Sequence, residues 1–315
     1  MKVFAFTVFA VVVAASSVSL KAQSPQSAPP LPAQPPTQPP PQPPPQPQKP
    51  PTPAEVDAKN KEIEAKNKQI EADNAAVVQS FTTGNDALNA NKLDDAIAAY
   101  REGLRVRPDE PALLTNFAEA LRRRGVTSWN EGLHAEGAAK EAKRSAAKND
   151  WTEAAASSAR ALQSLNQFPA EQQQQPAFLQ TKTAAASTRA LAMRLVASKV
   201  DQTQAGTAWD ANVEYVSITS DPAEKSKLKG EGLQMLFEAR AFDLAILHSR
   251  AVLKEEPEHL DASRVLGLAL FASGDKAKMA EALPHLQMYV DKAPDSDPQK
   301  ESVKETIAVI KAQKP

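Results

Sequence analysis

Four histidines are the side chains most able to bind a metal ion or to transfer protons, and they are widely separated: His134, His248, His259 and His285. Two histidines four residues apart on a helix, with a carboxylate nearby, would indicate a metal site, and no pair has that spacing. The chain has no cysteine, which excludes disulfides, thiol catalysis and cysteine-ligated metals. It also lacks a glycine-rich phosphate loop and the G-x-S-x-G nucleophile motif. We therefore predict no metal, no cofactor and no catalytic residue.

A run of arginines at residues 122–124 is a candidate site for an anionic ligand. Basic residues that close a helix also interact favourably with the helix dipole and with solvent, and we favour that dipole and solvation interpretation. The formal net charge of −1 gives no general attraction to nucleic acid or to anionic lipid, so we expect no nucleic-acid partner.

Residues 83–108 have the pattern of two short amphipathic helices joined by a tight turn. Asn91 and Lys92 interrupt the hydrophobic periodicity, and Pro108 ends the second run. Small residues at helical spacing let antiparallel helices come into contact, while larger side chains fill the space between them. The small residues are Gly84, Ala87, Ala96 and Gly103, and the larger ones are Leu93, Ile97, Tyr100 and Leu104.

The register of this hairpin resembles a tetratricopeptide repeat. Its matching positions are Gly84, Ala96, Tyr100, Gly103 and Pro108, whereas Thr83 stands where the family usually has Leu. The resemblance implies an all-α fold, a superhelical array of antiparallel helix pairs, over residues 76–313. A last helix over 298–311 has one apolar and one charged face, as a capping helix requires.

The other repeats match the pattern less regularly. We expect a helix from Pro111 that Gly125 ends, then an irregular stretch before a helix capped by Asn149 or Asp150. The glutamine-rich stretch 168–176 predicts an exposed connector, with an interaction strip as the alternative. Clearer signals follow: helix starts at Asp221-Pro222 and Asp297-Pro298, and family register at Phe242, Ala245, Ile246, Leu253 and Pro257.

The first 53 residues lack the repeat pattern. Lys2 and a short apolar core predict a signal peptide over residues 1–22, with an uncleaved membrane anchor as the alternative. Residues 23–53 are rich in Pro and Gln, so we expect a disordered linker of polyproline II type; the alternative is a ligand for a proline-reading module. These features predict export to the periplasm or outside a bacterium, with membrane contact only if the signal segment stays uncleaved.

Residues 54–75 carry a heptad pattern. Aliphatic side chains recur every seven residues and asparagines follow four later: Val56, Ile63, Ile70 and Val77, with Asn60, Asn67 and Asn74. This spacing is typical of a coiled coil and makes parallel self-association one interpretation. The other is a single polar helix whose thin stripe packs on the first repeat hairpin.

In the family that the chain resembles, first-helix residues line the groove in which partners bind. Carried over by position, the resemblance selects Phe81, Asn85, Leu88, Asn89, Thr115, Glu119, Arg122, Arg123, Gly230, Gln234, Phe237, Arg264 and Leu268. For Phe81, Leu88 and Phe237 the alternative is packing between repeats. Some relatives hold a peptide's terminal carboxylate with a Lys and an Asn; Asn85 matches the Asn, but Phe81 stands where the Lys belongs.

We therefore expect a non-catalytic scaffold of the bacterial cell envelope that binds other proteins or peptides in this groove. Two alternatives stay open. The pair Glu301-Ser302 resembles the catalytic motif of helical lytic transglycosylases, which implies an envelope enzyme acting on peptidoglycan, although the Gly-Leu-Met-Gln run of that family is missing. A heptad helix joined to such repeats also resembles periplasmic proteins that coordinate wall synthesis with outer-membrane constriction.

Overall fold

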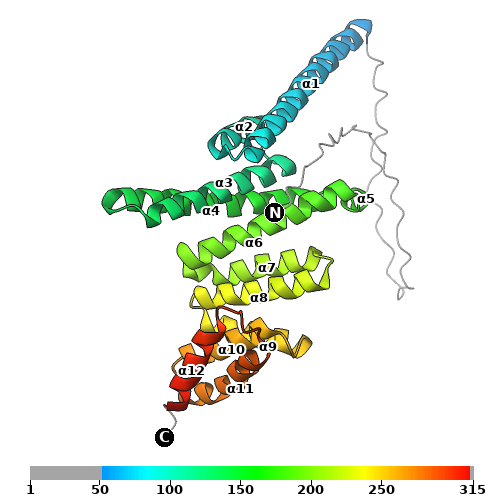
Figure 1. The fold of residues 1–315 in the computed structure, drawn as a ribbon. Helices are drawn as coiled ribbons and strands as arrows, with labels where there is room; N and C mark the ends of the chain where they lie inside the picture. The colour runs from blue at the N-terminus through cyan, green and yellow to red at the C-terminus, as the bar shows by residue number, and fades with distance from the viewer. Residues whose placement is uncertain (1–51, 313–315) are drawn as a thin grey trace, which may run out of the picture. The chain divides into compact units, whose positions relative to one another are not determined.

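The computed structural model describes residues 52–312, and this range contains twelve α-helices, one short 3-10 helix and no strand (Figure 1). The all-α prediction is confirmed. The chain divides into two compact units, residues 1–72 and 73–315. The predicted signal peptide and nearly all of the predicted linker lie outside the described residues. Within the described range, none of the helices combines the length and apolar composition needed to span a membrane.

The helices, in chain order, are α1 (Pro53–Asn89), α2 (Leu93–Val106), α3 (Pro111–Leu133), α4 (Gly137–Asn166), α5 (Ala170–Gln173), α6 (Pro176–Lys199), η1 (Gln202–Gln204), α7 (Ala205–Ile218), α8 (Pro222–Glu238), α9 (Phe242–Glu255), α10 (Leu260–Ala272), α11 (Lys276–Lys292) and α12 (Lys300–Ala312).

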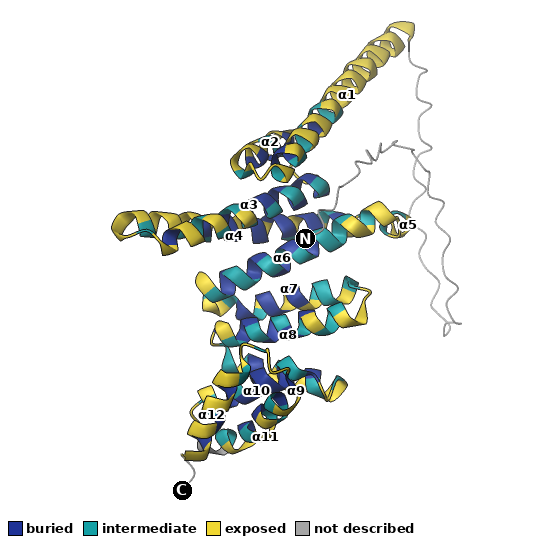
Figure 2. Ribbon diagram, in the orientation of Figure 1, coloured by how far each residue is buried: buried dark blue, intermediate teal, exposed yellow. Residues whose placement is uncertain are grey.

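The first unit is described from Thr52, where α1 begins with a capping box. The Thr52 backbone N–H donates to Glu55 Oε2 at 2.7 Å, and the Glu55 N–H donates to Thr52 Oγ1 at 3.3 Å. These hydrogen bonds satisfy two donors that a helix start leaves without partners, and Pro53 fits the first helical position. The hydrogen bonds from Thr52 lower the pKa of Glu55. The helix remains exposed over residues 53–72 (Figure 2).

The second unit opens with the predicted hairpin, formed by the end of α1 and α2. Asn91 adopts a φ of 56° in the turn, a left-handed conformation that asparagine tolerates. Tyr100 is fully buried over Gly84, where an added Cβ would lie 2.6 Å from Tyr100 Cδ1. The small residue is therefore required by the ring, as the sequence pattern predicted.

The next hairpin, α3–α4, corrects three expectations. Gly125 does not end α3, which continues to Leu133; it is a packing glycine, because a Cβ there would lie 2.5 Å from Trp151 Nε1. The stretch expected to be irregular is helical apart from residues 134–136, and neither Asn149 nor Asp150 is a cap, because both lie inside α4. Asp150 is instead buried, with its carboxylate 2.7 Å from Arg124 Nη2.

The remaining helices form successive pairs: α6 with α7, α8 with α9 and α10 with α11. The first helix of each pair also contacts the first helix of the next, so α6 touches α8 and α8 touches α10. Buried residues concentrate where these helices meet (Figure 2). Asp221 caps α8 as predicted, accepting the Ala223 N–H at 3.0 Å. The stretch 168–176 is a largely exposed connector that contains α5.

The terminal helix α12 begins at Lys300, two residues later than the sequence indicated. The reason is local: the Asp297 carboxylate accepts the Gln299 N–H at 2.9 Å, which closes a turn before the helix. Its apolar face is nonetheless the predicted one, since Val303, Ile307 and Ile310 are buried.

Candidate partner-binding pocket

The first helices of three successive pairs, α6, α8 and α10, line an open pocket of about 210 Å³, which we name the α8 pocket. Its lining residues are Arg194 from α6, Gly230, Glu231, Gln234, Met235 and Glu238 from α8, and Asp261 and Arg264 from α10. The structure therefore brings together three residues selected from the sequence, Gly230, Gln234 and Arg264. A larger residue than Gly230 would force Asp261 to shift, because an added Cβ would lie 2.8 Å from Asp261 Oδ2.

Arg264 organises one wall of the α8 pocket. Only 4% of the residue is exposed. Its Nη1 donates to Gln234 Oε1 at 2.8 Å and to Gln299 Oε1 at 2.6 Å, while Nη2 donates to Asp261 Oδ1 at 2.8 Å. The guanidinium also lies over the Tyr289 ring, 5.7 Å from its centroid. A buried guanidinium needs such partners, so Arg264 holds Gln234 in place rather than presenting a free charge.

Among the charged residues that line the α8 pocket, one carboxylate has no basic partner. Arg194 pairs with Glu231 at 2.9 Å, and Arg264 pairs with Asp261. Glu238 accepts a hydrogen bond from Gln234 Nε2 at 3.0 Å, and no basic side chain pairs with it within residues 52–312. Three carboxylates against two guanidiniums give the lining a formal charge of −1, which favours a cationic group.

The predicted residues of the first hairpin serve mainly to hold it together. Asn85 Oδ1 accepts hydrogen bonds from the Tyr100 hydroxyl at 2.7 Å and from Asn116 Nδ2 at 2.8 Å. Burial of Tyr100 raises the pKa of its hydroxyl. Phe81 and Leu88 are partly buried against the core, which agrees with packing between helices, while Asn89 is exposed.

The run of arginines at 122–124 forms ion pairs in the middle of α3, so the helix-dipole interpretation was wrong: the helix ends nine residues further on, at Leu133. Arg122 Nε and Nη2 each donate to Glu119 at 2.8 Å, and Arg123 Nε donates to the same carboxylate at 2.6 Å. Burial tends to raise the pKa of Glu119, but the hydrogen bonds and charges of the two arginines outweigh it, so the pKa is lowered. These residues do not line the α8 pocket.

Thr115, Phe237 and Leu268 also lie outside the α8 pocket. Thr115 is buried and its hydroxyl donates to the Pro111 carbonyl at 2.7 Å. Phe237 and Leu268 pack against the core, which agrees with the packing alternative for Phe237.

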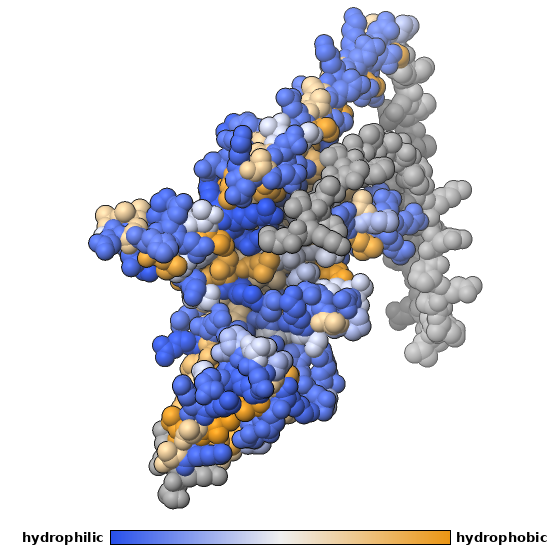
Figure 3. Space-filling model, in the orientation of Figure 1, coloured by the Kyte–Doolittle hydropathy of each residue, from blue (hydrophilic) through white to orange (hydrophobic). Residues whose placement is uncertain are grey.

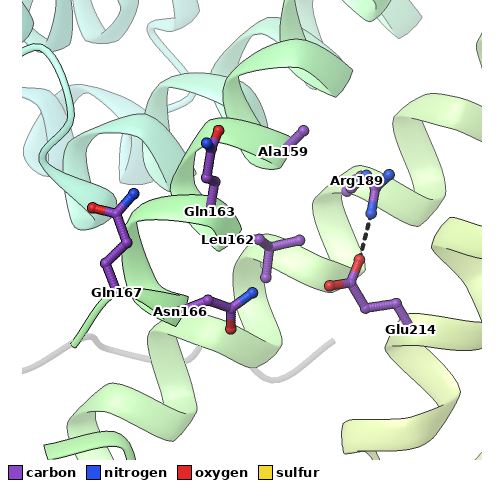
Figure 4. A pocket seen from close by; sticks show the side chains of 7 residues that line it. All are labelled: Ala159, Leu162, Gln163, Asn166, Gln167, Arg189 and Glu214. Carbon is purple, nitrogen blue, oxygen red and sulfur yellow. Dashed lines mark hydrogen bonds and ion pairs between the residues drawn. The ribbon is translucent and has the colours of Figure 1, made fainter. Parts of the chain in front are cut away.

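A second pocket, of about 450 Å³, lies where α4, α6 and α7 meet (Figure 4). It is lined by Ala159, Leu162, Gln163 and Asn166 from α4, Gln167 directly after it, Arg189 from α6 and Glu214 from α7. Arg189 and Glu214 form an ion pair across one side. None of these residues was selected from the sequence, because the central repeats fit the family pattern poorly. The signal that could have found them is the spacing of three amides on one helix face, at 163, 166 and 167.

The residues first considered for catalysis do not gather into a site. No group of His, Asp and Glu side chains within residues 52–312 is arranged to hold a metal ion. His259 caps α10, accepting the Ala262 N–H on Nδ1 at 3.2 Å. Glu301 is exposed on α12, lies in neither pocket, and accepts a hydrogen bond from Lys304 at 3.0 Å.

Comparison with known proteins agrees with the repeat register. Residues 81–150 and 235–297 match the model of the tetratricopeptide repeat family. No curated protein matches the chain. Three solved structures are similar at low identity. The MamA protein is 17% identical, with 72% of this chain and 94% of that chain covered and a TM-score of 0.37. The TPR domain of P58(IPK) is 13% identical, with 81% of this chain and 71% of that chain covered and a TM-score of 0.32, and the TPR2AB domain of yeast Sti1 in complex with pHSP90 is 15% identical, with 75% of this chain and 99% of that chain covered and a TM-score of 0.29. The chain therefore contains tetratricopeptide repeats, at residues 81–150 and 235–297.

Proposed function

We propose that the chain is a non-catalytic scaffold that binds a segment of a partner polypeptide in the α8 pocket. The observation that carries this proposal is that first helices of three successive pairs line one pocket of mixed polar and apolar character. Stacked helical repeats use such surfaces to bind extended or helical peptides. The repeats themselves support a protein-interaction scaffold.

The charge of the α8 pocket specifies the partner further. Glu238 is exposed at the pocket and has no basic partner within the described residues, whereas both guanidiniums are already paired. A lysine or arginine of the bound segment would supply the missing cation. We therefore propose a partner segment that places a basic side chain beside Glu238.

Site-specific crosslinking in living cells tests this proposal. A photoreactive residue at Gln234, which is partly exposed in the α8 pocket, should capture a protein partner. The matched control is the same residue at Lys254, which is exposed on α9 and outside both pockets. Glu238→Lys should reduce the adduct at Gln234 by like-charge repulsion. Equal adducts at both positions, or none at Gln234, would contradict a pocket-specific partner.

We also propose that the scaffold works in the cell envelope of a bacterium. The support is the basic start and short apolar core at residues 1–22, which lie outside the described residues. Fractionation of cells making the full chain, compared with cells making a chain without residues 2–22, tests export. Recovery of both forms in the cytoplasm would contradict it.

Two finer versions differ in what the scaffold does there. A coordinator of wall synthesis and outer-membrane constriction would yield crosslinked partners from that machinery. An enzyme acting on peptidoglycan would release soluble products that Glu301→Gln abolishes, and that result would overturn the non-catalytic proposal.

A further inference from the structure

The exposed part of α1, residues 53–72, carries aliphatic side chains that its own unit leaves in water. Val56, Ile63 and Ile70 are 41%, 47% and 53% exposed, and they recur every seven residues. Figure 3 shows this part of α1 as mostly hydrophilic, with small hydrophobic patches. Aliphatic groups at heptad spacing fall on one face of a helix, where a second helix could cover them.

The structure also shows where this row of side chains stops being accessible to a second helix. The sequence continues it through Asn74 and Val77. In the second unit, however, Asn74 Oδ1 accepts a hydrogen bond from Arg107 Nη2, and Val77 is only 8% exposed within the hydrophobic core. Val77 therefore cannot take part in self-association, contrary to the sequence expectation. Five seam positions remain, at Val56, Asn60, Ile63, Asn67 and Ile70.

We propose that residues 53–72 form a parallel, in-register coiled coil with the same segment of another copy of the chain. The charged residues on either side of this row favour the parallel, in-register arrangement. With the aliphatics at d and the asparagines at a, Lys59 and Lys66 occupy g, while Glu64 and Glu71 occupy e. In a parallel pair each g residue faces the e residue five positions further along the partner.

That geometry joins opposite charges twice on each side of the coil, Lys59 to Glu64 and Lys66 to Glu71. An antiparallel pair would instead place g opposite g and e opposite e, so lysine would face lysine and glutamate would face glutamate. Asparagine at a adds to the selection, because paired asparagines can hydrogen-bond only when the copies are in register.

The charged groups are available for this pairing. Lys59, Glu64 and Glu71 make no ion pair within residues 52–312. Lys66 Nζ lies 2.5 Å from Glu62 Oε1 on the same helix, but both side chains are more than 60% exposed, so the lysine can exchange partners at little cost. The consequence is several repeat arrays in one assembly, which would strengthen binding to any partner with more than one binding segment.

The mass of the full chain in solution tests the association. Sedimentation should give a multiple of the 33.8 kDa chain mass for the wild type and the single mass for Ile63→Asp. Ala65→Asp is the matched control, because it adds the same charge two residues away at an f position, which faces outward. It should keep the wild-type mass. Since residues 63 and 65 are both exposed, thermal unfolding of the repeats should be unchanged in both variants. A monomeric wild type, or equal masses for the two variants, would overturn the proposal.

Charge reversal tests the register. Lys59→Glu with Lys66→Glu places like charges at both contacts and should weaken association on the order of tenfold or more. Glu64→Lys with Glu71→Lys should do the same. A mixture of the two variants restores every contact, so it should associate as tightly as the wild type. Failure of the mixture to associate more tightly than either variant alone would contradict the assignment of these charges.

A disulfide tests the direction, and the chain is suited to it because it has no cysteine. Parallel copies bring residue 70 against its equivalent, so Ile70→Cys should crosslink with itself under mild oxidation. Antiparallel copies would separate the two equivalents by about 20 Å and bring residue 70 near residue 56 instead. Crosslinking only in a mixture of Val56→Cys and Ile70→Cys would overturn the parallel arrangement.

Discussion

The first two hairpins of the second unit solve the same packing problem in different ways. Each places an aromatic ring against a glycine of the facing helix: Tyr100 lies over Gly84 and Trp151 lies over Gly125. The Tyr100 hydroxyl donates to Asn85, whereas the buried Trp151 Nε1 has no hydrogen-bond partner within the described residues. Only the first contact falls in the family register. The family pattern thus gives one position at which an aromatic ring packs on a glycine of the facing helix, and the same contact also forms at positions outside the pattern.

The second hairpin adds a buried ion pair beside its glycine. Arg124 Nε and Nη2 donate to the Asp150 carboxylate at 2.9 and 2.7 Å, and Arg124 Nη1 donates to Asp94 of α2 at 2.7 Å. The hydrogen bond to Asp150 is the main reason that the pKa of Arg124 is raised. One guanidinium therefore links α4, α3 and α2, so we expect the second hairpin to depend on this charge far more than the first does.

Removing that guanidinium should produce the largest effect. Arg124→Ala leaves Asp150 buried with its charge unpaired, because its side chain is only 8% exposed. The expected loss in the free energy of unfolding is about 3–5 kcal/mol. Denaturant unfolding followed by circular dichroism measures it.

The control is Asp94, the solvent-exposed partner of Arg124. Asp94→Ala removes an ion pair with an 84% exposed carboxylate and should cost less than about 1 kcal/mol. Combining Arg124→Ala with Asp150→Ala should recover much of the loss, because no buried charge remains. Equal costs for Arg124→Ala and Asp94→Ala would show that the buried pair does not hold the hairpin.

Adding one methyl group at either glycine tests whether the two ring contacts are equivalent. Gly84→Ala and Gly125→Ala place a Cβ too close to a buried ring, so each should destabilise the protein by about 1–3 kcal/mol despite the better helix propensity of alanine. Gly206→Ala is the matched control in α7. Its nearest neighbour would be Leu244 Cδ1 at 3.9 Å, so propensity should dominate and add up to about 1 kcal/mol of stability. A stabilising Gly125→Ala would mean that Trp151 moves easily and that only the first hairpin needs its glycine.

The contrast explains how much of the fold could be read from the sequence. The first hairpin and α8 were predictable because their signals are local: Tyr100 four residues after Ala96, or Asp221 before Pro222. Gly125 was misread because a glycine near the end of an apolar run normally stops a helix. Only the long-range contact with Trp151 shows otherwise, and no local pattern encodes it.

The residues of the candidate site also divide into those that the sequence could identify and those that it could not. Gln234 and Arg264 could be placed by family register, and the structure joins them through a hydrogen bond. Arg194, Glu231 and Glu238 could not, because their role depends on which helix of a neighbouring repeat faces them. The amides of the second pocket were missed for the same reason, since α4 is longer than a regular repeat helix.

Removing a single hydroxyl should have a smaller effect, confined to the first hairpin. Tyr100→Phe deletes the donor to Asn85, but Asn85 Oδ1 keeps its hydrogen bond from Asn116 at 2.8 Å. The acceptor is therefore not left without a partner, and the expected cost is about 1 kcal/mol. Tyr100→Phe combined with Asn116→Ala should cost more than the sum of the two single changes, because Asn85 then loses both donors. Simple additivity in denaturant unfolding would contradict this shared acceptor.

The smallest effect is a pH dependence that belongs to α3 alone. The arginines lower the pKa of Glu119 below its ordinary value of 4.5. A carboxyl group with a depressed folded pKa contributes its full stability above the unfolded pKa and loses it as the pH falls through the folded pKa. The difference in free energy of unfolding between the wild type and Glu119→Gln should therefore be greatest near pH 7 and shrink only below the ordinary pKa. Unfolding curves for both proteins from pH 7 down to acid conditions measure it, and a difference that stays constant throughout would show that the arginines do not favour the charged form of Glu119.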